Sequence, residues 1–126
     1  MNTLPEGLAN LILESASEFA ILTMDNGGAI TSWNPGAENL MGWAREEAIG
    51  QHGRMIFTSE DQAAGSPEDE MKRASAEGRA VDERLHVRAD GSRYWGSGLM
   101  MPLLNGPDGQ HGFLKMIRDR TAEREA

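Results

Sequence analysis

The turn Asp90-Gly91-Ser92 and the two runs that it joins constrain the fold more than any other stretch of this chain. Residues 81–88 precede the turn and residues 93–103 follow it, and both runs are rich in residues that favour β-strands. Asp-Gly between two such runs predicts a hairpin, because glycine adopts the positive φ that tight turns require. A second turn over residues 105–109 leads into a third run, residues 112–118. These runs predict a three-stranded antiparallel meander.

A second strand pair and several short helices are predicted before the meander. Strands are expected over residues 19–25 and 29–34, on either side of the hairpin turn Asn26-Gly27-Gly28. Helices are expected over residues 5–17, 36–41, 45–49, 54–57 and 66–77, the last with Ser66 as its N-cap and Pro67 in its first turn. Strands at both ends of the chain, with helices between them, are typical of an α+β fold. Since neither strand block is large enough to be stable alone, one five-stranded antiparallel sheet is expected.

Composition excludes several classes of function. The chain has 126 residues and a net charge of −8, so one domain is expected, without a nucleic-acid or anionic-membrane partner. It has no cysteine, which excludes disulfides, thiolate metal sites and cysteinyl adducts. Its apolar stretches are shorter than the roughly 20 residues that span a bilayer, and its first residues lack the basic-then-apolar order of a signal peptide. A cytoplasmic location without membrane insertion is therefore expected.

No residue pattern indicates catalysis or a metal site. The carboxylates of the helical region are expected to be solvated or to cap helices; they are Glu46, Glu47, Glu60, Asp61, Glu68, Asp69 and Glu70. The three histidines, His52, His86 and His111, lack the spacing of metal ligands. No serine or histidine lies in a nucleophile motif. The chain is therefore not expected to be an enzyme.

Three sequence patterns together resemble a known family. They are Ile30-x-x-Trp33-Asn34-x-x-Ala37-Glu38-x-Leu40-x-Gly42-Trp43-x-x-Glu46-Glu47-x-Ile49-Gly50, then Arg88-x-Asp90-Gly91-Ser92-x-x-Trp95, then Gly112-Phe113-x-x-x-x-Arg118-Asp119-x-Thr121. In this order they resemble a PAS sensor domain of the PAS/PAC type, as found in bacterial sensor histidine kinases. The resemblance covers about residues 17–121. It implies a five-stranded antiparallel sheet with short helices packed on one face around a small cavity.

The resemblance also implies a domain organisation and a function. Residues 1–17 would form a flanking helix, residues 18–121 the PAS domain, and residues 122–126 the start of a C-terminal signalling helix capped by Thr121. Such domains are sensory or interaction modules of larger two-component signalling proteins and have no enzymatic activity of their own. The motif Asp119-x-Thr121 would pass the signal from the sheet to an output domain of the parent protein.

Two cofactors of the family are not expected here. Heme-binding members usually carry a histidine on the helix before the meander, and residues 67–77 contain none. Light-sensing members carry a reactive cysteine in the segment that matches residues 53–57 and asparagines on the meander, where this chain has His86 and Gly96. A cysteine-adduct flavin is thus excluded and the cofactor, if one is bound, is unknown.

The direction in which His86 points has two alternatives. If Leu85 and Val87 face the helices, His86 points to solvent or to a partner. If the family register holds, His86 and Gly96 face the cavity, and Leu85 lies on an apolar outer face with Trp95 and others. We favour the family register. In it, His86 would contact a polar ligand or be satisfied by Arg84, Tyr94 or a backbone carbonyl.

Two functions remain open. In the first, a small and mostly apolar ligand binds a cavity lined by Met55, Phe57, Met71, His86, Tyr94, Gly96 and Gly98. In the second, the module binds no small molecule and works as a dimer. The interface with the flanking helix or a second copy is then expected to involve Leu8, Leu11, Ile12, Leu85, Trp95 and Leu99. A homodimer is expected in either case.

Overall fold

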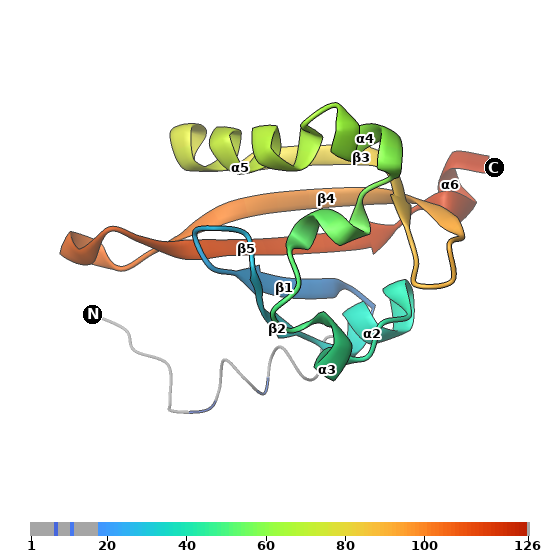
Figure 1. Cartoon of the computed structure of the whole chain (residues 1–126), viewed down its shortest axis with the longest axis horizontal. Helices are drawn as coiled ribbons and strands as arrows, with labels where there is room; N and C mark the ends of the chain where they lie inside the picture. Colours follow the sequence, from blue (N-terminus) through green and yellow to red (C-terminus); the bar gives the residue numbers. More distant parts are fainter. Residues whose placement is uncertain (1–6, 8–10, 12–17, 126) are drawn as a thin grey trace.

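One antiparallel sheet of five strands forms the framework of the protein. The computed structural model describes residues 7, 11 and 18–125. The strands are β1 (Ala20–Met24), β2 (Ile30–Trp33), β3 (Ala80–Val87), β4 (Arg93–Leu104) and β5 (Gln110–Asp119). Their order across the sheet is β2-β1-β5-β4-β3, so the last strand of the chain lies at the centre, between β1 and β4 (Figure 1). The predicted fold class is confirmed.

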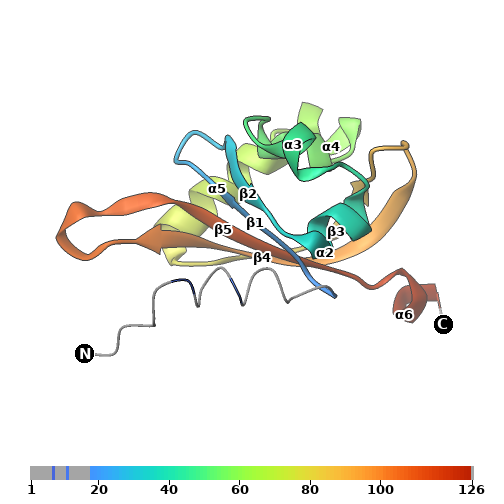
Figure 2. The same cartoon turned by 90° about the horizontal axis from the view of Figure 1, so that it is seen from below.

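Short helices connect the two strand blocks and cover one face of the sheet. They are α2 (Pro35–Met41), α3 (Arg45–Ala48), the 3-10 helix η1 (Gly53–Ile56), α4 (Ser59–Ala63) and α5 (Ser66–Glu77). Figure 2 shows α3, α4 and α5 on one side of the sheet. A second 3-10 helix, η2 (Gly106–Asp108), forms the β4–β5 turn, and α6 (Thr121–Glu125) follows β5.

Capping residues explain where the helices begin and end. Asn34 accepts a hydrogen bond from the Ala37 amide at the start of α2, and Thr58 accepts one from the Asp61 amide at the start of α4. The predicted bounds of α5 are correct, but the predicted cap is not. Gly65, with φ of +78°, is the residue before the first helical position, and Ser66 and Pro67 lie inside the first turn. The chain between α4 and α5 is left-handed at Gly65, a backbone conformation that a serine in this position would adopt only with strain.

The Asp90-Gly91 hairpin forms as predicted. Gly91 has φ of +87°, and the Asp90 carboxylate accepts a hydrogen bond of 2.9 Å from the Ser92 amide. The two strands pair from Val87 with Arg93 to Ala80 with Met100. This register decides which side chains of the meander face the helices.

The two faces of the sheet differ, and His86 lies on the inner one. His86 is fully buried beneath the helices, whereas Leu85 is 42% exposed on the opposite face. The structure therefore has the orientation implied by the family register. The apolar part of the core joins the sheet to α2, α3 and η1 and includes Leu22, Ile56 and Ile117.

The flanking helix predicted over residues 5–17 lies largely outside the described residues, as do Leu8 and Ile12. Leu11 is described; its side chain is 64% exposed, and its amide donates a hydrogen bond of 3.0 Å to the Gly7 carbonyl. None of the helices in the described part of the chain is long and apolar enough to cross a membrane.

Candidate functional site

A cluster of four ionisable side chains lies under the helices, where the resemblance predicted a cavity. Glu70 comes from α5, Asp82 and His86 come from β3, and Lys115 comes from β5. Each of them is at most 1% exposed. Asp82 and His86 are four residues apart on one strand, so they share the inner face. We call these four residues the buried ionic cluster.

Lys115 links α5 to the sheet through two carboxylates. Its Nζ donates to Oδ2 of Asp82 at 2.9 Å and to Oε1 of Glu70 at 2.5 Å. Asp82 also accepts a hydrogen bond from Nε of Arg84 through Oδ1. Arg84 in turn reaches Oδ2 of Asp61 in α4 at 3.2 Å. Lys115, Asp82 and Arg84 thus connect α4, α5, β3 and β5.

His86 bridges the sheet and η1. Its Nδ1 lies 3.0 Å from the carbonyl oxygen of Ile56, and its Nε2 lies 2.9 Å from Oδ2 of Asp82. A carbonyl and an ionised carboxylate are both acceptors, so both contacts are hydrogen bonds only when both ring nitrogens carry protons. Gly96 makes the bridge sterically feasible, because a Cβ there would lie 2.7 Å from Cδ2 of His86.

Burial and mutual charge set the pKa values in the cluster. Burial raises the pKa of Glu70, and the charge of Lys115 offsets part of this effect. Burial also acts to raise the pKa of Asp82, but the hydrogen bond with His86 and the charge of Lys115 outweigh it and hold that pKa far below its ordinary value. Burial lowers the pKa of His86, against the opposing hydrogen bond with Asp82. Asp82 is therefore the permanently ionised member.

Aromatic rings complete the surroundings of the cluster. The Phe57 ring lies 4.8 Å from Nζ of Lys115 and packs edge-on against His86, with ring centroids 5.0 Å apart. The Tyr94 ring lies 5.8 Å from His86. Two buried oxygen atoms in the described residues have no hydrogen-bond partner, namely Oε2 of Glu70 and the hydroxyl of Tyr94. Such atoms are rare in native interiors and mark places where a polar group could bind.

The free space beside the cluster is small. The enclosed cavity has a volume of about 10 Å³ and is lined by Phe57, Met71, Lys115 and other residues. Of the seven residues predicted to line a cavity, Phe57, His86, Tyr94, Gly96 and Gly98 are buried, and Met55 and Met71 are half-buried. The imidazole of His86 occupies the room that Gly96 leaves on β4.

Within the buried ionic cluster, the expectation for Glu70 was wrong, and Asp82 and Lys115 were not recognised as members from the sequence. Glu70 was expected to be solvated with the other helix-start carboxylates, but it is fully buried. It lies three residues after Pro67, on the face of α5 that also buries Ala74. Lys115 lies on an inner-facing position of β5, between the apolar and buried residues Phe113 and Ile117. Period-two alternation could have identified it as a buried cation that needs buried carboxylates, Asp82 among them.

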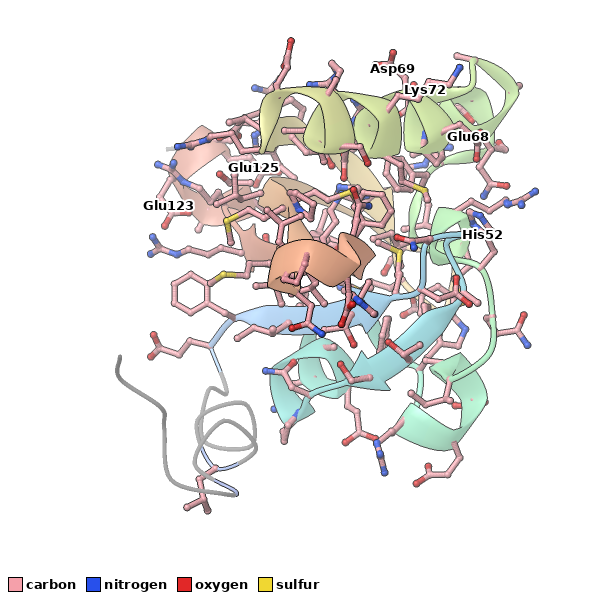
Figure 3. All side chains as sticks on the ribbon, turned by 90° about the vertical axis from the view of Figure 1, so that its left-hand side faces the viewer. His52, Glu68, Asp69, Lys72, Glu123 and Glu125 are labelled. Carbon is pink, nitrogen blue, oxygen red and sulfur yellow. The ribbon has the colours of Figure 1, made fainter. Side chains whose placement is uncertain are left out.

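A larger groove opens on the surface beside α5. It has a volume of about 510 Å³ and lies between α5, the β1–β2 turn and β5. Glu68 and Lys72 project from α5, and His52 lies next to the β1–β2 turn (Figure 3). Met71 and His52 line both this groove and the enclosed cavity. These two side chains are thus the boundary between solvent and the interior.

The predicted relay residues form a compact junction at the end of the sheet. Oδ1 of Asp119 accepts hydrogen bonds from the Thr121 amide at 2.9 Å and from its hydroxyl at 2.6 Å. The Thr121 hydroxyl oxygen also accepts a hydrogen bond of 2.9 Å from the Trp95 amide. Arg88 pairs with the other Asp119 oxygen at 3.1 Å and donates to the Leu40 carbonyl at the end of α2. The start of α6 is therefore connected to β4, β5 and α2.

The outer face of the sheet is apolar. Val81 is 54% and Leu85 is 42% exposed. Half-buried apolar side chains surround them, namely Trp95, Leu99, Met101, Leu114 and Met116. On this face Leu85 pairs with Trp95 and Leu99 with Met116. Three predicted interface residues, Leu85, Trp95 and Leu99, thus share one surface, and Arg124 of α6 lies over the Trp95 ring at 3.7 Å. No group of residues in the described ranges is arranged to hold a metal ion.

Comparisons with known proteins agree with this architecture. The family described as "PAS fold" matches residues 14–125. The chain is 37% identical over 117 residues to "Two-component system protein A" of Emericella nidulans, and the match covers 92% of the chain but only 17% of that protein. A PAS domain of a protein from Colwellia psychrerythraea superposes with a TM-score of 0.82 at 25% identity, over 91% of this chain and 97% of that one. The chain matches only a small part of its curated relative, so the activity of a whole protein does not follow from it.

A second similar structure is that of an RNA-binding light-oxygen-voltage receptor. It superposes with a TM-score of 0.78 at 22% identity, over 99% of this chain and 37% of that one. At this identity the likeness concerns the fold alone. The family match covers nearly the whole sequence, and the five-stranded sheet with helices on one face has the architecture of that family. The chain belongs to the PAS family and is a sensory domain related to two-component signalling proteins.

Proposed function

We propose that this domain is a non-enzymatic, cytoplasmic signalling module that pairs with a second copy through the outer face of its sheet. A conformational change is then handed to an output domain through Asp119, Thr121 and the helix that follows. Residues 1–17 flank the domain, residues 18–121 form it, and residues 122–126 begin the output helix. The observation that carries the proposal is the apolar outer face of a sheet whose inner face is almost completely filled.

The filled interior favours an interaction module over a ligand sensor. A cavity of about 10 Å³ has room for about one water molecule. Pockets for small molecules usually have volumes of about 300–1,000 Å³. The space beside Gly96 is taken by His86, and the charges around it are paired with each other rather than directed at an empty site.

The outer face has the properties of an interface. Its exposed and half-buried apolar residues lie on neighbouring strands of one sheet, on either side of the hydrogen-bonded polar pair Glu83 and Ser97. An antiparallel sheet with apolar residues on both faces needs cover on both faces. A second copy provides a surface of the same chemistry, and isologous contacts are the most common way in which soluble proteins pair.

Two charge substitutions on the outer face test the proposal. Leu85→Arg and Leu99→Arg place a cation in the contact, and each is expected to weaken dimerisation by about 100-fold because an unpaired charge would be buried. Light scattering at several protein concentrations measures the effect. Leu104→Arg is the matched control, since Leu104 is 73% exposed at the β4–β5 turn. A dimer that survives both substitutions, or a wild-type domain that stays monomeric at millimolar concentration, would refute the pairing.

A second candidate function, sensing of a small ligand inside the domain, is favoured by the two unpartnered oxygen atoms. The Tyr94 hydroxyl and Oε2 of Glu70 are buried without a hydrogen bond, and a small polar ligand could supply one. No heme and no cysteine-linked flavin is expected in this site. Native mass spectrometry of the purified domain distinguishes the candidates. A mass above that of the chain, removed by unfolding, would support the ligand sensor over the interaction module.

A further inference from the structure

The buried ionic cluster contains two places where a proton can be gained or lost without a change of fold. We propose that Glu70, Asp82, His86 and Lys115 form a proton-binding site that determines how firmly α5 and η1 are held against the sheet. This inference goes beyond the proposed pairing and does not depend on it. It rests on the hydrogen-bond geometry of His86 and on the unpartnered oxygen of Glu70.

The proton on His86 controls the contact between η1 and the sheet. Nδ1 faces the Ile56 carbonyl of η1, and Nε2 faces the Asp82 carboxylate. The imidazolium donates to both acceptors, whereas neutral imidazole donates to only one. Loss of the proton therefore removes one of the two hydrogen bonds. Because Asp82 is also bound by Lys115 and Arg84, it remains ionised and keeps attracting the proton.

The proton on Glu70 controls the contact between α5 and the sheet. Oε1 receives the Lys115 ammonium, while Oε2 has no partner. A proton on Oε2 therefore breaks no existing hydrogen bond. It also removes a buried negative charge, and the loss of hydration of that charge outweighs the attraction of Lys115. The raised pKa of Glu70 means that a proton there favours the state in which α5 covers it, and the lowered pKa of His86 means that a proton there favours the state in which η1 has moved away.

The surroundings bring the two titrations toward each other. Burial raises the pKa of Glu70 from its ordinary 4.5 and lowers the pKa of His86 from its ordinary 6.5. The other charged or titratable groups that face the cluster are Arg84 of β3, Asp61 of α4, Tyr94 of β4 and, across the Tyr94 ring, Arg88. Arg84 and Asp61 pair with each other, so their charges largely cancel. Mild acidification then moves the stronger attachment from η1 to α5.

The cluster lies close to the output junction along two strands. Lys115 is four residues before Asp119 on β5, and both belong to the strand that leads into α6. His86 pairs with Tyr94, the neighbour of Trp95, whose amide binds the Thr121 hydroxyl. A change in the attachment of α5 or η1 therefore acts on strands that end at the proposed exit of the signal.

Amide hydrogen exchange of the full chain tests the proposal, with rates corrected for the intrinsic effect of pH. From about pH 7.5 to about pH 5.5, exchange in α5 is expected to fall about tenfold and exchange in η1 to rise by a similar factor, the effect of about 1.4 kcal/mol at each site. Glu70→Gln is expected to abolish the change in α5, and His86→Gln the change in η1. Glu77→Gln and His111→Gln are exposed controls on α5 and β5 and should keep both changes.

A second measurement needs no variant of the cluster. Nuclear magnetic resonance of the wild-type chain follows the His86 ring nitrogens and the Glu70 carboxyl carbon between about pH 5 and 8, the range in which histidine titrates. Titration of both groups in that range, including in the Leu85→Arg variant, supports the proposal independently of dimerisation. The proposal is overturned if neither group titrates, or if exchange in α5 and η1 is the same at both pH values.

Discussion

At the scale of single residues, Lys115 is the buried cation on which two buried carboxylates depend. It satisfies two buried carboxylates and lies 4.8 Å from the Phe57 ring centroid. A buried ion pair contributes little compared with an apolar pair of the same size, but removal of one partner leaves the other charge buried without compensation. The residue therefore matters more for what its absence would leave behind than for its own net contribution.

Lys115→Met is expected to lower the free energy of unfolding by about 3–5 kcal/mol, because Glu70 and Asp82 would face each other without a cation. Urea unfolding followed by circular dichroism measures the change. Lys72→Met is the control, since Lys72 is exposed on α5 and has no ion pair among the described residues. A loss below about 1 kcal/mol for Lys115→Met, the size typical of a surface pair, would show that the cluster is more hydrated than its burial indicates.

Gly96→Ala is expected to cost about 1–3 kcal/mol through overpacking, since the new methyl group would lie 2.7 Å from the His86 ring. The melting temperature and the chemical shifts of His86 report the effect. Gly98→Ala is the matched comparison two residues away. There the nearest atom, the Met116 carbonyl oxygen, would be 3.3 Å from the methyl group, so a smaller loss is expected. Equal losses at both positions would argue against a specific role for His86.

At the scale of elements, β5 joins the interior to the exit of the domain. It is the central strand, pairs with both β1 and β4, and carries Lys115 on its inner face and Asp119 at its end. The helix α6 is short and has no buried residue, so its position depends on the junction with Thr121 rather than on packing.

Thr121→Val removes the hydroxyl that accepts the Trp95 amide and donates to Asp119. Exchange of the Trp95 amide is expected to accelerate by roughly fivefold, which corresponds to the net value of about one hydrogen bond. Global stability is expected to change little, since the site is at the edge of the domain. Ser97→Ala removes a hydroxyl on β4 that is bonded to Glu83 of β3, and it should leave the Trp95 amide unaffected. Unchanged exchange in Thr121→Val would refute the connection between β4 and α6.

At the scale of the whole molecule, Asp82 links the charge of the interior to acid stability. Its pKa is held far below the ordinary 3.8 by His86 and Lys115, despite burial. A carboxylate with a lowered pKa stabilises the folded state above its unfolded pKa, and this contribution is lost as the pH falls below that value. Glu70 acts in the opposite sense, since its raised pKa favours the folded state as the pH falls.

The wild-type domain is expected to lose stability steeply below about pH 4, where unfolded Asp82 takes up a proton and folded Asp82 does not. Asp82→Asn is expected to be less stable at neutral pH and to show a shallower decline in acid. Urea unfolding at a series of pH values measures both slopes, and Asp69→Asn, exposed on α5, is the control. Equal slopes for the wild type and Asp82→Asn would contradict the assignment.

Much of the architecture could be predicted because its causes are local. The Asp90-Gly91 turn requires a left-handed glycine, and the alternation on either side of it sets the strands. The positions at which helices begin follow from capping residues such as Asn34 and Thr58. The relay pair Asp119 and Thr121 lies two residues apart, so its hydrogen bonds form within one turn of chain.

The candidate site could be predicted only in part. His86 was identified as an inner-face residue through the family register, but its partners Asp82 and Ile56 were not. Glu70 and Lys115 are 45 residues apart, and nothing in either local sequence indicates that they meet. Their pairing depends on α5 packing over β3 and β4 within reach of Lys115 on β5, which the helical pattern of residues 66–77 does not specify.

The sequence by itself determined the fold family and the absence of cysteine chemistry, because these depend on the order of short motifs and on composition, and it favoured one of two orientations for the meander. Only the tertiary structure decided what lies behind the Asp90-Gly91 hairpin. Buried charges are stable only with partners of opposite sign at hydrogen-bond distance. Such partners come from separate elements, so the filled, charged interior around His86 and Lys115 is a property of packing that no short stretch of the chain reveals.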